Sequence, residues 1–371
     1  MSETSLWRHF SCDASTCVNT CCAGWRIPFI QQDRERIRSL PQEAQQDILA
    51  NIHLPEEAIA IKNERCSFLT GENLCRIILD YGEAYLGTVC VVFPRQVNRL
   101  GRYAERSVRS SCPHVVMEVL GSERISILAG AQDDVETDFL PFRKLRDFLI
   151  AALQSMDGAM AGKVWILLEF VKDVEGLLPC RALSLEMADK MIREYAGQYS
   201  SILTECAKDT SDKERVEEAF LFFAHQLRSA IHQKKALKYA PSLWSDVDRW
   251  QDDRRGLRTD MNRLSDLLRE CGPLFSENYL TNEVFLNWKN PSQGYFCEDL
   301  YSSLAKWMIF YVIMLSAVRN GNLIEKVWLS RMVSDMDRDY THNDEARHKM
   351  GAAIAKARDH VQHKPWLFPF W

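Results

Sequence analysis

The sequence lacks the features of several common protein classes. Its 371 residues carry a net charge of -5, without the basic excess with which general nucleic-acid-binding proteins neutralise phosphates. The amino-terminal stretch MSETSLWRHF has neither a basic segment nor an apolar core, so we predict no secretory signal and a location in the reducing cytoplasm. The longest apolar run, residues 307–318, is shorter than the about 20 residues that span a bilayer. We therefore expect a buried core helix there, and neither membrane nor nucleic acid as a partner.

Three short motifs are also absent. No CxxC pair occurs, although zinc sites commonly use this spacing, and no HExxH motif occurs. The absence of any GxG argues against a cofactor held on a glycine-rich turn after a parallel strand. Strand and helix patterns do not alternate, so an α/β fold with a parallel sheet is not expected.

Cysteine, in contrast, is abundant and unevenly placed. The stretch CDASTCVNTCCAGWRIP, residues 12–28, contains four cysteines, and the last two are adjacent. Eight of the twelve cysteines lie in the first 112 residues, and these are Cys12, Cys17, Cys21, Cys22, Cys66, Cys75, Cys90 and Cys112. The other four lie singly among helical patterns, where small buried thiols are common, and these are Cys180, Cys206, Cys271 and Cys297.

Four roles compete for the eight amino-terminal cysteines. Disulfides are disfavoured in a cytoplasmic protein, and the small polar residues between the thiols do not suit core packing. A catalytic nucleophile needs one cysteine with a histidine base, and few histidines lie nearby. We favour metal ligation, because thiolates select zinc, copper(I) or iron–sulfur clusters. An iron–sulfur cluster needs four thiolates and accepts this loose spacing, so a second metal or spare thiols stay open, with zinc as the alternative metal.

The periodicity of apolar residues predicts the fold class. Three- and four-residue spacing indicates helices over 142–156, 162–178, 184–199, 211–233, 301–321 and 344–362. The first 120 residues are irregular, with short helices over 33–52, broken near Pro41, and over 75–90. Residues 96–111 favour a hairpin that turns near Gly101, while a helix with a stripe of arginines is the alternative. We predict a mainly α protein in which an irregular, cysteine-rich metal-binding domain, 1–120, packs on a larger all-helical domain, 121–371.

Several stretches resemble the flagellin lysine N-methylases of enteric bacteria. They also resemble, more distantly, a wider group of zinc- or iron-chelating CxxxCC proteins. The stretches are FSCDASTCVNTCCAGWRIP (10–28), CSFLTGENLCRI (66–77), CVVFPR (90–95) and ERSVRSSCP (105–113). The segment FSENYLTNEVF (275–285) is similar to part of the helical region of that family.

This resemblance implies an enzyme that transfers methyl groups from S-adenosylmethionine to lysine side chains of flagellin. It also implies a [4Fe-4S] cluster on the cysteines, and all eight amino-terminal cysteines have counterparts in the family. Methyl transfer needs a neutral amine, whereas the pKa of a free lysine is about 10.4, so a proton acceptor is expected. Because GxG is absent, S-adenosylmethionine would bind in some other way than on a glycine-rich turn.

The segment around residue 280 supplies candidates for this chemistry. Glu277 and Tyr279 are candidate proton acceptors, and Asn278 and Asn282 are candidates for holding the amino-acid end of the cofactor. Arg95 is a candidate for binding the cofactor's carboxylate or an acidic stretch of flagellin. In the alternative interpretation, Tyr279 packs the helix while Glu277 and Asn278 cap its start. A non-enzymatic adaptor, in which zinc or iron staples the cysteine domain and the helices bind a partner, also stays open.

Overall fold

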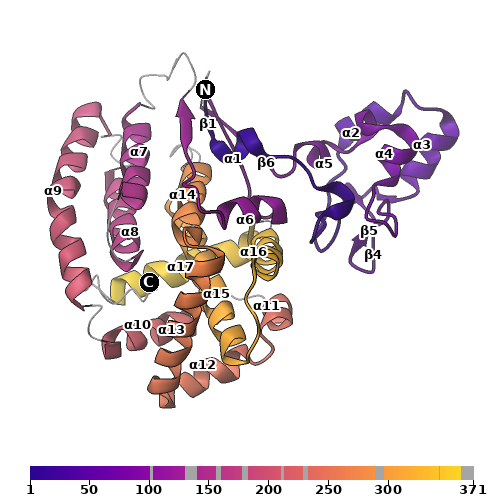
Figure 1. Ribbon diagram of the computed structural model, residues 1–371. Helices are drawn as coiled ribbons and strands as arrows, with labels where there is room; N and C mark the ends of the chain where they lie inside the picture. Colours follow the sequence, from indigo (N-terminus) through magenta and orange to yellow (C-terminus); the bar gives the residue numbers. More distant parts are fainter. Residues whose placement is uncertain are drawn as a thin grey trace.

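The protein is mainly helical, as the sequence predicts (Figure 1). The computed structural model describes residues 1–100, 103–129, 140–155, 160–177, 183–209, 213–228, 233–288, 296–341 and 343–360. The buried apolar side chains of these residues form two separate hydrophobic cores. The smaller core contains buried side chains such as Phe29, Ile48 and Phe68, and the larger one is centred on the long helices that follow residue 140.

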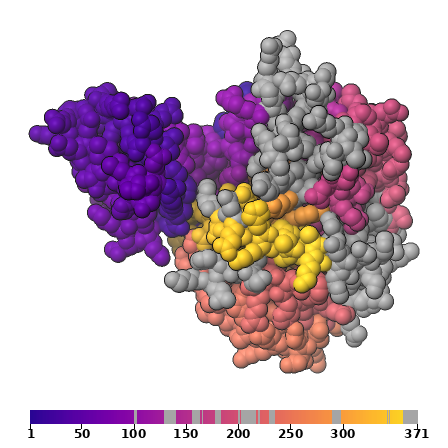
Figure 2. All heavy atoms as spheres, turned by 180° about the vertical axis from the view of Figure 1, so that it is seen from behind, coloured from indigo at the N-terminus to yellow at the C-terminus, as the bar shows by residue number. Residues whose placement is uncertain are grey.

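We call residues 22–93 the small lobe, residues 10–21 the linking segment, and the rest of the described chain the helical body. Figure 2 shows the indigo small lobe as a distinct mass beside the body. Residues of the first strand and helix, and the described residues of 95–100 and 103–120, pack with the body. The division between the cores therefore does not coincide with residue 120, and the 1–120 domain stays a prediction.

Short elements make up the small lobe. They are α2 (Gln31–Ile37), α3 (Gln42–Leu49), β2 (Ile52–His53), β3 (Ala58–Ile59), β4 (Ile61–Lys62), β5 (Arg65–Cys66), α4 (Arg76–Tyr81), the 3-10 turn η2 (Glu83–Tyr85) and α5 (Thr88–Val92). Pro41 separates α2 from α3, as expected. The helix predicted over 75–90 is instead divided in three, because Gly82 adopts a φ of 95° that ends α4.

A four-stranded sheet lies in the body beside the small lobe. Its strands are β1 (Ser2–Thr4), β6 (Arg95–Leu100), β7 (Tyr103–Val108) and β8 (Ile127–Ala129), in the order β6-β7-β1-β8. Strands β6 and β7 are antiparallel, and Leu100 pairs with Tyr103. The predicted hairpin is thus confirmed, and the alternative of an arginine-striped helix is wrong. The parallel pairing of β1 with β7 fixes the amino terminus on the body.

Helices form the rest of the described chain. The linking segment holds the 3-10 turn η1 (Ala14–Thr16), and the body contains α1 (Ser5–His9), α6 (Pro113–Val119), α7 (Leu140–Ser155), α8 (Met160–Leu177), α9 (Leu185–Asp209), α10 (Lys213–Leu227), α11 (Gln233–Tyr239), α12 (Leu243–Asp252), α13 (Arg254–Cys271), α14 (Phe275–Asn287), α15 (Phe296–Arg319), α16 (Lys326–Thr341) and α17 (Asp344–His360). Among the isolated cysteines, Cys271 packs half-buried against the larger core, while Cys180 lies outside the described residues.

Helix α15 forms the centre of the body. It is long and apolar enough to cross a membrane, but its apolar window is entirely buried among the neighbouring helices. The run at 307–318 is thus the core helix that the sequence predicts. Helix α15 ends at Arg319, and Gly321 follows with a φ of 76°, a conformation that favours glycine.

A buried ionic group joins α14, α15 and α16. The Nζ atom of Lys306 lies 2.9 Å from Oε2 of Glu283 and 2.6 Å from Oδ1 of Asp337. Burial lowers the pKa of Lys306, but the two carboxylates outweigh burial and raise it. Since a buried charge is costly without partners, this group fixes how the three helices meet.

Candidate metal centre in the small lobe

Seven of the eight amino-terminal cysteines line one cavity of about 200 Å³ at the edge of the small lobe. They are Cys12, Cys17, Cys21, Cys22, Cys66, Cys75 and Cys90. The eighth, Cys112, is buried at the start of α6 in the body. All eight are free thiols. The fold thus brings most of the predicted ligands together, although the chain places them in four separate segments.

Turns and bridges of the small lobe fix three of these cysteines. The backbone N–H of Cys66 donates to the carbonyl of Cys22 at 2.8 Å, which holds the two segments side by side. Cys66 follows a tight turn in which Asn63 and Glu64 adopt positive φ, and this turn joins β4 to β5. Cys75 occupies the N-cap of α4 and pairs with Leu69 in an isolated bridge.

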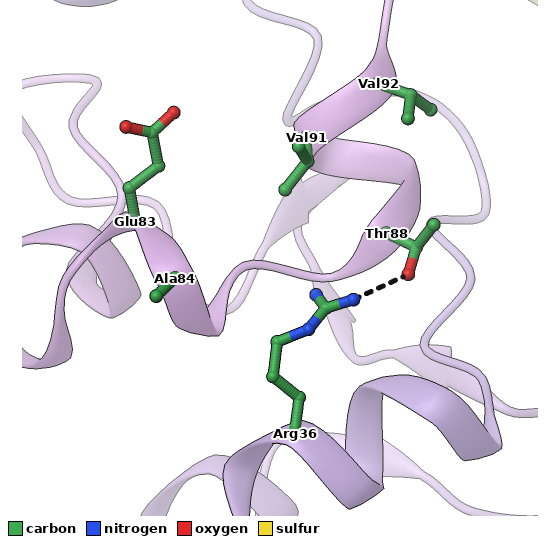
Figure 3. A pocket seen from close by; sticks show the side chains of 6 residues that line it. All are labelled: Arg36, Glu83, Ala84, Thr88, Val91 and Val92. Atoms are coloured by element: carbon green, nitrogen blue, oxygen red, sulfur yellow. Dashed lines mark hydrogen bonds between the residues drawn. The ribbon is translucent and has the colours of Figure 1, made fainter.

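The fourth segment is α5, which carries Cys90. The carboxylate of Asp33 accepts hydrogen bonds from the backbone N–H of Thr88 at 2.8 Å and from its hydroxyl at 2.6 Å. Figure 3 shows Arg36 reaching from α2 to the Thr88 hydroxyl, 3.2 Å away, across an outer depression of the lobe that contains no cysteine. Helix α2 therefore fixes the start of α5 and, with it, the place of Cys90.

Burial makes most of these thiols hard to ionise. It raises the pKa of Cys66 to about 12 and that of Cys112 to about 11, and it raises the pKa of Cys90 further. Cys22 differs, because a hydrogen bond from the Cys21 thiol outweighs burial and lowers its pKa to about 7. A bound cation would stabilise thiolates that the apolar cavity alone disfavours.

Helix α16 holds the loop that carries Cys21 and Cys22. The buried guanidinium of Arg338 donates to the backbone carbonyl of Thr20 at 2.8 Å and to that of Ala23 at 3.0 Å. Sequence reasoning missed Arg338, since an arginine on a polar helix gives no sign that it will be buried.

Neighbouring contacts strengthen this attachment. The side-chain amide of Asn19 donates to Oδ1 of Asp335 at 2.8 Å, and Nε of Arg331 donates to the carbonyl of Val18 at 3.0 Å. Burial would raise the pKa of Asp335, but hydrogen bonds, chiefly from Lys238, Tyr239 and Asn19, lower it to about 2. The charge of Asp335 is thus part of the contact between α16 and the linking segment.

The four α14 residues that the sequence proposes for catalysis and cofactor binding lie deep in the body. Glu277 forms ion pairs with Arg124, at 2.6 Å, and with Lys163, at 3.3 Å. The Tyr279 hydroxyl is buried, and burial, followed by the charges of Glu283 and Asp337, raises its pKa well above the usual value. Neither side chain lines the cysteine cavity.

The two asparagines and Arg95 also lie outside the cavity. Asn278 donates to the carbonyls of Val119 and Glu123, and Asn282 donates to that of Val108 at 2.9 Å. The guanidinium of Arg95 lies 4.8 Å from the Phe10 ring centroid, on an exposed strand. The structure therefore does not bring these five predicted residues to the thiols, and their roles stay predictions.

The side chains that line the cavity determine which kind of metal centre could bind there. Within the described ranges, no three His, Cys, Asp or Glu side chains are grouped closely enough to hold a metal ion as they stand. Thiols surrounded by apolar side chains are nevertheless the donors that iron–sulfur clusters use. Trp25, Phe68 and Phe93 are the aromatic residues of the lining, and the Trp25 and Phe93 ring centroids lie 5.9 Å apart.

Curated relatives agree with the resemblance seen in the sequence. Flagellar biosynthetic protein FliU of Salmonella muenchen is 27% identical over 132 residues, which cover 32% of this chain and 76% of FliU. Lysine-N-methylases of Salmonella choleraesuis and Salmonella typhimurium are 28% and 27% identical over 131 residues, 32% of this chain and of each methylase. Over about a third of its length, the chain is thus similar to lysine-N-methylases and to a flagellar biosynthetic protein.

This similarity has a limited extent. The match spans about a third of the length of the curated lysine-N-methylases, so the activity of those proteins does not pass to this chain without a test. No family model matches the chain, and no solved structure matches it.

Proposed function

We propose that this protein transfers methyl groups from S-adenosylmethionine to lysine side chains of flagellin, and that its cysteine cavity holds a [4Fe-4S] cluster. The observation that carries the proposal is the cavity itself, where seven thiols and three aromatic rings face one enclosed space. The names of the relatives, lysine-N-methylase and flagellar biosynthetic protein, support the reaction and the kind of substrate.

The lining of the cavity suits the reactants. Aromatic faces attract cations, so Trp25, Phe68 and Phe93 favour the sulfonium of S-adenosylmethionine. An apolar surrounding also disfavours the ammonium form and so lowers the pKa of the lysine that enters it. The Trp25 ring is fixed for this role, because its Nε1–H donates to the carbonyl of Cys21 at 2.6 Å.

The cysteines would hold the cluster, and the lobe's backbone would fix their positions. When bound, the cluster would supply a structural staple for the four segments. The roles of Glu277 and Tyr279 as proton acceptors, of Asn278 and Asn282 at the cofactor, and of Arg95 toward a carboxylate remain part of the proposal.

One observation favours a second candidate function. The proposed proton acceptors are buried in the body and do not line the cysteine cavity. A metal-binding adaptor, in which zinc or iron staples the lobe and the body binds a partner, needs no such groups. This alternative shares the metal centre with the enzyme and differs from it in the reaction.

A transfer assay separates the two functions. We would incubate anaerobically purified protein with labelled S-adenosylmethionine and unmethylated flagellin, and we expect label on flagellin lysines. The protein should be brown and contain about four iron atoms and four sulfides per chain. A Cys271→Ala variant, altered at a cysteine of the body, serves as a control. It should keep both the methyl transfer and the iron and sulfide content. Colourless protein with stoichiometric zinc and no transfer would establish the adaptor instead.

A further inference from the structure

Eight thiols are twice the number that one [4Fe-4S] cluster binds, so the ligands must be a subset. We infer that Cys22, Cys66, Cys75 and Cys90 ligate the cluster, and that the other four amino-terminal cysteines do not. This assignment rests on the proposed function only in taking the cavity to hold a cluster. The sequence offers no means of choosing, because all eight cysteines belong to the family pattern.

Packing separates the four proposed ligands from the rest. Cys66 is buried in the small hydrophobic core of the lobe, and Cys22, Cys75 and Cys90 pack against the same core. Cys112 belongs instead to the larger core of the body. The four thiols thus come from segments that share one folding unit.

Backbone contacts make this group rigid. The Cys22 and Cys66 segments are joined by a direct hydrogen bond. The backbone N–H of Arg76, the residue after Cys75, donates to the carbonyl of Phe68 at 2.8 Å. Phe68 lies two residues after Cys66, so this bond ties the Cys75 segment to the Cys66 segment. Cys90 is tied to the lobe through the contact of Asp33 with the start of α5. A rigid set of ligands in one unit is what a preformed cluster site requires.

Three of the remaining thiols, Cys12, Cys17 and Cys21, line the same cavity but belong to the linking segment and not to the core of the lobe. The linking segment is fastened to the body, where Asp13 Oδ1 lies 2.9 Å from Nδ1 of His114. Cys12 is exposed to solvent at the rim of the cavity.

Single cysteine-to-serine variants test the division, with iron, sulfide and absorbance near 400 nm as the readouts. We expect Cys75→Ser and Cys90→Ser to lose most of their iron, and the matched controls Cys12→Ser, Cys17→Ser and Cys112→Ser to keep about four iron atoms. Loss of the cluster in Cys17→Ser or Cys112→Ser, or its full retention in Cys75→Ser, would overturn the assignment.

A second measurement on the unaltered protein avoids variants that do not fold. Native alkylation with mass spectrometry should leave Cys22, Cys66, Cys75 and Cys90 protected while the cluster is present, and label them after it is removed with ferricyanide and EDTA. Cys12 and Cys17 should be labelled to the same extent in both states. Equal protection of Cys12 and Cys17 by the cluster would contradict the assignment.

The two proposals fail in different ways. If wild-type protein takes up neither iron nor sulfide on anaerobic reconstitution, both the proposed cluster and the ligand assignment are ruled out. If the wild type binds a cluster and Cys12→Ser, Cys17→Ser or Cys112→Ser loses it, only the ligand assignment is ruled out, and the proposed function is unaffected. No readout in this series depends on methyl transfer.

Discussion

Replacing Arg338 by methionine should detach the cysteine loop from the helical body. The variant keeps an apolar stem of similar length but loses the charged donors to the carbonyls of Thr20 and Ala23. Two hydrogen bonds from a charged group, at about 2 kcal/mol each, correspond to a loss of about 4 kcal/mol in the free energy of unfolding. Asp335 adds little to this loss, because Lys238 and Tyr239 remain as its partners.

Urea unfolding followed by circular dichroism measures the loss in stability, and hydrogen exchange resolved by peptide locates it. We expect faster exchange over residues 18–24 than in the wild type, with little change in the central helix α15. Arg331→Met is the matched control, since Arg331 lies on the same helix and contacts the same segment from an exposed position. That contact should contribute about 1 kcal/mol or less. Equal losses in the two variants, or unchanged exchange over 18–24, would refute the reasoning.

Three further predictions concern buried groups of the body. Because the pKa of Asp335 is lowered to about 2, its charge stabilises the fold above about pH 4. This contribution, roughly 2 kcal/mol, is lost as the pH falls toward 2. Urea titrations should therefore show that the free energy of unfolding depends less on pH over that window in Asp335→Asn than in the wild type. Lys306→Met leaves two buried carboxylates without their cation and should cost about 3–5 kcal/mol in the same assay, whereas Lys349→Met, at an exposed ion pair, should cost less than about 1 kcal/mol. Tyr279→Phe removes a buried hydroxyl and keeps the ring, so stability should change by about 1 kcal/mol or less. Because Tyr279 is a proposed proton acceptor, methyl transfer should fall, and undiminished transfer at unchanged stability would contradict that role.

The sequence determined the local structure because local structure depends on neighbours in the chain. Three- and four-residue apolar spacing predicted the long helices, and the apolar run at 307–318 is the buried centre of α15. Pro41 marked the break between α2 and α3, and the pattern of residues 96–111 predicted the β6–β7 hairpin. The sequence also revealed that sulfur is concentrated in the first third of the chain.

Only the tertiary structure decided which of these residues meet. Seven cysteines line one cavity while Cys112 lies in the body, because the chain returns to the body at β6 before it reaches residue 112. The resemblance placed Glu277 and Tyr279 in a helical region, but α14 is buried on every side, so no pattern of apolar residues could show which face meets a cavity. The burial of Arg338 likewise arises from a loop more than three hundred residues earlier in the chain. Contacts of this kind depend on how the lobe and the body pack, and no local pattern in the sequence records that packing.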